Sequence, residues 1–285
     1  MTPNNNLSVL PFYNSIGRQN HRKSYAFGAM YPLFSPMNTI LPFQIIRPRP
    51  TATNPITAVN LKDKDGNQIA DITSTMVSNG LVLKQFSADG YDIIYYPGNM
   101  PISFQTSKGY HYLEIVAGDT YYSEMFTFVD NIERYLKIQW WDAENLYFES
   151  GHIDYTPPFR NTLYLKTELG KPEYPFEEQG SNRDGFFFPE KQISEKTYKF
   201  VFLAPEYLLD AIRVARMSDA IRITSMGQVY NCDTFLITPT WETQGDLASV
   251  EAEFECATIV KKVGRGVVLG DLGDFNDDFS NDFNN

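Results

Sequence analysis

The chain has 285 residues, of which 24 are Lys or Arg and 35 are Asp or Glu, so its formal net charge is -11. This acidity argues against a protein that binds nucleic acid, because nonspecific affinity for phosphates depends on clustered Lys and Arg. No apolar run approaches the roughly 20 residues that span a bilayer, and the first residues lack the pattern of a signal peptide, so we expect synthesis in a cytoplasm and no membrane partner.

The composition favours a β-rich protein of two domains. Aromatic residues make up 15% of the chain, with 18 Tyr and 21 Phe. Such a content is typical of sheet proteins and of subunits with large interfaces. The length is enough for two modest domains that each bury a core.

Residues 1–55 predict an extended arm. Prolines recur through this segment, where they fix φ, remove backbone donors and prevent a long helix. The segment is also too apolar for a free linker, so we expect it to dock on a partner. Its candidate contacts are aromatic: Phe12, Tyr13, Tyr25, Phe27, Tyr31, Phe34 and Phe43.

Residues 56–130 predict an immunoglobulin-like β-sandwich. Short alternating runs are separated by turn dipeptides such as Asn79-Gly80 and Asp89-Gly90, and this alternation is the signature of half-buried strands. Six or seven short strands at this spacing are typical of such a sandwich. We expect them at 57–61, 68–72, 81–86, 91–96, 110–116 and 121–129.

Residues 131–266 predict a second β-rich domain, of α+β type, with one helix. The helix is expected over 205–218, where Pro205 suits the first turn and apolar residues recur at helical spacing. Pro and Gly among acidic residues predict a long loop from 169 to 189 that contacts a partner. Strands are expected at 136–141, 145–148, 153–155, 162–167 and 197–202.

Two hairpins are expected near the end of this domain. One turns at Met226-Gly227, and the other pairs residues 234–240 with 248–258. If the second is symmetric about Gln244, Cys232 lies opposite Cys256. Reduced thiols are then the default in a cytoplasm, whereas a register shift of one residue would place the two cysteines on opposite faces.

No pattern in the chain predicts a catalytic, cofactor or metal site. Residues 63–67 resemble part of a calcium loop, but Ser74 stands where the closing Glu belongs, so a turn between strands is favoured. Three carboxylates share one face of a strand, which is more often a solvated face than a catalytic site. They are Glu251, Glu253 and Glu255. We expect a protein that is not an enzyme, with a glycan-cleaving enzyme that uses such carboxylates as a remote alternative.

Two aromatic groups suit partner binding. One could form a stacking platform for sugars, although core and interface packing are the commoner uses; it consists of Trp140, Trp141 and Tyr147. The other lies in an acidic tail, 267–285, which has five Asp and neither Lys nor Arg. Its rings recur every four residues and could enter a partner groove, although a frayed terminus has the same composition. They are Phe275, Phe279 and Phe283.

Several phrases between residues 100 and 266 resemble structural proteins of tailed phages and prophages of Bacteroidetes, crAss-like phages included. The phrases are Ile138-Gln-Trp-Trp-Asp142, Phe159-Arg-Asn-Thr-Leu-Tyr164, Gly170-Lys-Pro-Glu-Tyr174, the stretch 183–192 and the stretch 241–251. The resemblance implies a non-enzymatic virion protein of the tail or neck, of ring or collar type, made in the cytoplasm of a bacterial host. It also implies a homo-oligomer, a sixfold or twelvefold ring around the DNA conduit, that contacts other tail or neck proteins. The alternative is a carbohydrate-binding module of a receptor-binding apparatus.

Overall fold

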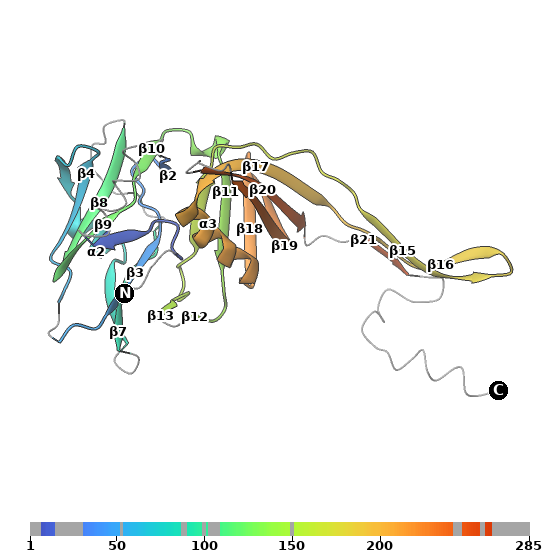
Figure 1. Cartoon of the computed structure of the whole chain (residues 1–285), viewed down its shortest axis with the longest axis horizontal. Coiled ribbons are helices and arrows are strands. Elements are labelled where there is room, and N and C mark those ends of the chain that lie inside the picture. Colours follow the sequence, from blue (N-terminus) through green and yellow to red (C-terminus); the bar gives the residue numbers. More distant parts are fainter. Residues whose placement is uncertain are drawn as a thin grey trace.

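The structure is a computed structural model that describes residues 7–14, 31–51, 54–86, 90–98, 101, 109–148, 151–241, 247–256 and 260–263. Within these residues the protein is mainly β, as the sequence predicts, and its strands form five sheets. Figure 1 shows an N-terminal module at one end, a six-stranded sheet in the middle and a narrow hairpin that projects from the other end.

The largest sheet of the N-terminal module is built around β8, which pairs with β4, β9 and β10. β10 also pairs with β2 in parallel, and β9 pairs with β1. The seven strands are β1 (Phe12–Asn14), β2 (Leu33–Pro36), β4 (Ala58–Asp63), β5 (Gln68–Asp71), β8 (Tyr110–Ala117), β9 (Asp119–Ser123) and β10 (Phe126–Val129).

A three-stranded sheet, ordered β3-β7-β6, completes the module. Its strands are β3 (Phe43–Pro48), β6 (Val82–Phe86) and β7 (Tyr91–Tyr96), and the short helix α2 (Thr73–Ser78) precedes β6. Every residue of β7 is buried. The strand is therefore covered on both faces, which suits its mostly apolar sequence; its one charged residue, Asp92, lies 3.7 Å from Arg47.

The described part of the predicted N-terminal arm belongs to this module. β1, β2 and β3 all come from before residue 56 and complete its two sheets. The prediction of an extended arm is therefore wrong for 7–14 and 31–51, and the immunoglobulin-like form predicted for 56–130 alone is not confirmed. Proline favours extended backbone, which serves an edge strand as well as an arm.

The second half of the chain forms a six-stranded sheet ordered β14-β11-β18-β19-β20-β17. The helix predicted over 205–218 is confirmed as α3 (Glu206–Ile212), continued by the 3-10 helix η2 (Arg213–Met217), with Pro205 at the N-cap. Another 3-10 turn, η1 (Ile132–Arg134), precedes the sheet. The strands are β11 (Leu136–Trp141), β14 (Asn161–Leu165), β17 (Thr197–Pro205), β18 (Ala220–Ser225), β19 (Gln228–Trp241) and β20 (Leu247–Cys256).

The hairpin of β12 (Leu146–Phe148) and β13 (Gly151–Ile153), together with residues 154–159 that follow it, connects the two halves through apolar packing and hydrogen bonds. Apolar residues from 153–159 pack with one face of β3 and β7. Gln44 exchanges two hydrogen bonds with the backbone of Asp154, at 2.8 and 2.9 Å. The Asp154 carboxylate also accepts from Lys84 at 2.5 Å. Since residues of both halves form one continuous core as well, the two halves pack as a single body.

The cysteine prediction is confirmed, and it depends on a β-bulge. Cys232 lies opposite Cys256, and both thiols are free. The rest of the hairpin is offset by one residue from the predicted symmetry, since Phe235 faces Phe254. The bulge between Cys232 and Thr234 absorbs this offset. An extra residue in one strand has this effect on the register.

The loop predicted from 169 to 189 is wrong in its second half. Residues from Phe176 onward form a hairpin of β15 (Phe176–Arg183) and β16 (Phe186–Ser194), and β21 (Val260–Val263) pairs with β16. Asp184 and Gly185 take φ values of 53° and 82°. Left-handed conformations at both turn positions define the type I′ turn of a two-residue hairpin, for which Asp-Gly is a preferred sequence.

Candidate functional site

The hairpin β15–β16, together with β21, is the most distinctive surface of the molecule, and we call it the arm. It extends away from the six-stranded sheet (Figure 1). Phe186 and Phe187, at its tip, are 71% and 47% exposed. Since neighbours on a strand point to opposite faces, the two rings present apolar surface on both sides of the arm.

The arm has no core of its own in the described part of the chain. β15 forms a strand pair only with β16, and β16 only with β15 and β21. The side-chain contacts between the two long strands are polar: Ser181 donates to Glu190 at 2.8 Å, and Gln192 donates to Glu178. Hairpins without an apolar face against a sheet or helix are marginally stable in water. The arm thus has both the exposed rings and the unsupported geometry of a segment that binds a partner.

The described aromatic residues among the partner contacts predicted for the N-terminal segment pack within this chain instead. Phe12 and Phe43 are 6% and 0% exposed, and their ring centres are 4.6 Å apart. Phe34 packs on Tyr135, with 4.9 Å between ring centres. The backbone carbonyl of Tyr31 accepts a hydrogen bond from Tyr207 of α3 at 3.5 Å.

Burial also sets the acidity of these phenols. It raises the pKa of Tyr31 to about 12. It raises the pKa of Tyr13 as well, with smaller contributions from the carboxylates of Glu124 and Asp210. Both phenols therefore stay neutral across the ordinary pH range. Tyr25 and Phe27 lie outside the described residues, as do Phe275, Phe279 and Phe283.

The predicted sugar-stacking platform does not form. Trp140 is fully buried in the main core, whereas Trp141, next on the strand, points to the opposite face of the sheet. The guanidinium groups of Arg160 and Arg222 lie 4.2 and 5.3 Å from the centre of the Trp141 ring. Tyr147 is exposed, on the hairpin β12–β13. The three rings thus do not share a face.

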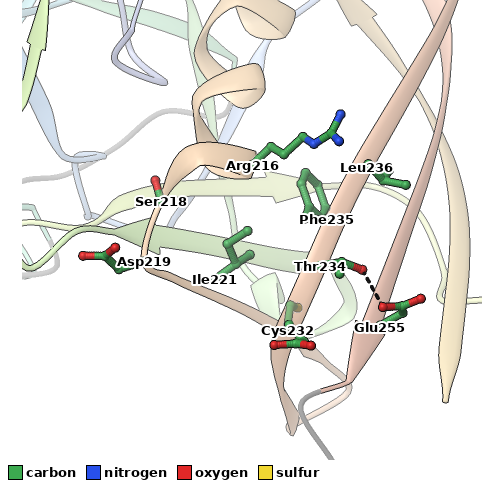
Figure 2. A pocket seen from close by; sticks show the side chains of 10 residues that line it. Arg216, Ser218, Asp219, Ile221, Cys232, Thr234, Phe235, Leu236 and Glu255 are labelled. Atoms are coloured by element: carbon green, nitrogen blue, oxygen red, sulfur yellow. Dashed lines mark hydrogen bonds between the residues drawn. The ribbon is translucent and has the colours of Figure 1, made fainter. Parts of the chain in front are cut away.

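A hollow of about 340 Å³ lies between η2 and the bulged part of β19. Figure 2 shows Cys232 and Thr234 in its wall, with the Thr234 hydroxyl donating to Glu255 at 3.1 Å. The Cys232 thiol donates to the backbone carbonyl of Tyr230 at 4.0 Å. Burial, and then the neighbouring Cys256, raise the pKa of Cys232 to about 12. The thiol is thus protonated at neutral pH, and nothing in this contact activates it as a nucleophile.

The remaining polar motifs are structural where the chain is described. The Asp63 carboxylate accepts hydrogen bonds from the backbone amides of Asp65 and Asn67, which makes residues 63–67 the predicted turn. Glu251, Glu253 and Glu255 share the outer face of β20, and Lys199 lies 3.8 Å from Glu253. No group of three or more His, Cys, Asp or Glu among the described residues could hold a metal ion.

No protein-family model matches the chain, and no curated protein sequence matches it either. Among the helices of the described residues, none combines the length and hydrophobicity that a membrane crossing requires. That the chain lacks enzymatic activity stays a prediction.

Proposed function

We propose that this protein is a non-enzymatic structural subunit of a phage tail or neck, one that assembles with its own copies in a ring around the DNA conduit. The observation that carries the proposal is the arm, a hairpin that has apolar rings at its tip and, as far as the chain is described, no core of its own. The phrases that resemble tailed-phage structural proteins supply the biological setting. A net charge of -11 also suits a wall beside DNA, because like charges repel.

In this proposal the arm binds a neighbouring subunit in two ways. Phe186 and Phe187 enter an apolar surface of the neighbour, because a few well-packed anchor residues carry most of the binding energy of an interface and aromatic residues are enriched there. The outer edge of β15, which has no partner strand among those described, accepts a strand of the neighbour. The locked body supplies the rigid base from which the arm reaches out.

The oligomeric state of the purified full chain tests the proposal. Mass photometry over a concentration series, followed by negative-stain microscopy, should reveal closed rings of uniform size. The proposal is contradicted if the chain remains monomeric at all concentrations up to about 100 μM and binds no other virion protein. Binding of glycans by such a monomer on an array would favour the carbohydrate-binding alternative.

A further inference from the structure

Three cationic side chains converge on the outer face of the six-stranded sheet. Lys137 comes from β11, Arg160 immediately precedes β14, and Arg222 comes from β18. The two arginines lie near the Trp141 ring, and the Lys137 ammonium is 5.9 Å from the centre of the Tyr164 ring. We call these five residues the cationic patch.

The register of the sheet builds the patch from residues that are distant in sequence. Lys137 faces Tyr164 on β14, and Gln139, two residues further on the same face, has Arg222 opposite it on β18. On β11 these positions alternate with Ile138 and Trp140, which are fully buried. Lys137, Trp141 and Arg222 therefore lie on the other face of the sheet, whereas Tyr164 is only 8% exposed and packs with the main core.

The charges of the patch are not neutralised within the described part of the chain. No described carboxylate lies within 4 Å of the three cationic groups, whereas other cations of the body have such partners: Arg47 with Asp92, Lys62 with Glu114, Lys84 with Asp154, Lys199 with Glu173, and Arg213 with Asp210.

The carboxylates nearest in sequence to the patch have other hydrogen-bond partners. Asp142 accepts from the backbone amide of Asp219, and Asp219 from that of Ala143, at 2.6 and 3.0 Å. Burial and then the repulsion of the two arginines lower the pKa of Lys137. The described part of an acidic chain thus holds three like charges together with no carboxylate beside them.

The chain itself contains a segment that is complementary to this patch. Residues 267–285 carry five Asp, three Phe and no cation. Carboxylates form paired hydrogen bonds with the fork of a guanidinium, and Phe rings pack on Trp and Tyr rings.

The segment begins close to Val263, the last described residue, which pairs with Lys191 of the arm. β14 and β11 lie at the edge of the six-stranded sheet that is opposite to β17, and in Figure 1 the arm leaves the body on the other side from β11. This placement favours the tail of another copy over the tail of the same chain.

We propose that the cationic patch is the docking site for the acidic Phe/Asp tail, residues 267–285, of a neighbouring copy. The inference rests on the proposed function, because it requires copies that assemble. Carboxylates of the tail neutralise Lys137, Arg160 and Arg222, and its Phe rings pack on the partly exposed Trp141 ring. The tail thereby gives the assembly a second contact, separate from the arm.

The test uses a fluorescent synthetic peptide of residues 267–285 and the full-length chain. In the chain, the five tail Asp residues are changed to Asn, so that its own tails do not compete. Fluorescence anisotropy should show saturable binding, weaker at about 0.5 M than at about 0.1 M salt because exposed charges are screened. The double change Arg160→Gln and Arg222→Gln should weaken binding by about tenfold or more.

Matched variants separate a specific site from general attraction. Arg134 and Lys166 are exposed cations outside the patch, so the double change Arg134→Gln and Lys166→Gln removes the same charge and should leave the affinity unchanged. The double change Arg160→Lys and Arg222→Lys keeps the charge but loses the fork, and should bind with intermediate affinity. Circular dichroism checks that each variant is folded.

Two outcomes overturn the inference: equal affinity for the Arg160→Gln and Arg222→Gln variant, or binding of a sulfated oligosaccharide but not of the peptide. If the full chain still forms rings in either case, the proposed function stands without this contact. If the chain binds the peptide at the patch but forms no ring, the proposed docking site is supported and the proposed ring assembly is contradicted.

Discussion

Replacement of Phe186 by Ser should separate assembly from folding. The ring is 71% exposed, and a Phe carries roughly 200 Å² of surface, so about 140 Å² becomes available to a partner. At about 25 cal/mol per Å², full burial of this area is worth about 3.5 kcal/mol. Interface hot spots contribute about 2 kcal/mol or more, and the proposal makes Phe186 one of them. The dissociation constant between subunits should therefore rise by about 30-fold to 300-fold.

Sedimentation velocity over a concentration series measures this change, and thermal unfolding checks the fold. The melting temperature should stay within about a degree of the parent, because an exposed ring contributes little to folding. Tyr147→Ser is the matched control: Tyr147 is also 71% exposed but lies on the hairpin β12–β13. An unchanged subunit affinity in Phe186→Ser, or an equal loss in Tyr147→Ser, would refute the role of the arm.

Three further experiments test contacts within the folded chain: the Lys84–Asp154 pair, the buried thiol of Cys232 and the burial of Trp140. Burial raises the pKa of Asp154, but hydrogen bonds from Lys84 and Thr156 outweigh it and hold that pKa below its usual value. The stability from this pair is thus complete above the unfolded pKa of about 3.9 and is lost as the pH falls through the lower folded pKa. Lys84→Met should cost about 3 kcal/mol in urea unfolding at neutral pH, and progressively less as the pH falls below the unfolded pKa of about 3.9; a cost that does not change with pH would contradict the pairing. Iodoacetamide at about pH 8 should modify Cys232 roughly a thousandfold more slowly in the folded than in the unfolded chain. Mass spectrometry measures the modification, and rapid alkylation of Cys232 in the folded chain would contradict the prediction. Trp140→Ala should lose about 3–5 kcal/mol of stability and Trp141→Ala clearly less; similar losses would place both rings in the core.

Local sequence patterns correctly predicted those strands and turns whose structure depends mainly on residues adjacent in sequence. The strand predicted at 91–96 has the same bounds as β7, and the one at 136–141 has the same bounds as β11. Their apolar residues alone indicate strands, whatever they pair with. The turn at Met226-Gly227 likewise follows from local conformation, since both residues take positive φ, 49° and 79°.

The strands that the sequence pattern missed depend on pairing with residues that are far away in sequence. Phe12 pairs with Ser123 across more than a hundred residues, and no local pattern reveals that a proline-rich segment will join a sheet so far along the chain. The hairpin at Asp184-Gly185 did carry a local signal in that dipeptide. The prediction instead followed the surrounding Pro, Gly and Glu residues, which favour a loop.

The cationic patch could not be predicted for the same reason. Lys137, Arg160 and Arg222 are separated by more than twenty residues each, and each alone is an ordinary, partly buried polar residue. Only the order β14-β11-β18 places them side by side. By contrast, the tail that we propose as their partner is evident from composition, because its charges and rings are adjacent in sequence.

The positions of these contacts constrain the symmetry of the proposed assembly. The arm projects from one end of the molecule, and the cationic patch lies near the opposite edge of the six-stranded sheet. A twofold dimer would require the two copies to exchange their arms or tails reciprocally across the axis. Without such an exchange, an arm or tail that binds a different surface of its neighbour forms a head-to-tail interface, and repeated head-to-tail contacts close into a ring when the rotation between neighbours divides the circle. The ring that we propose therefore requires each copy to bind one neighbour through its arm and tail and a different neighbour through its patch.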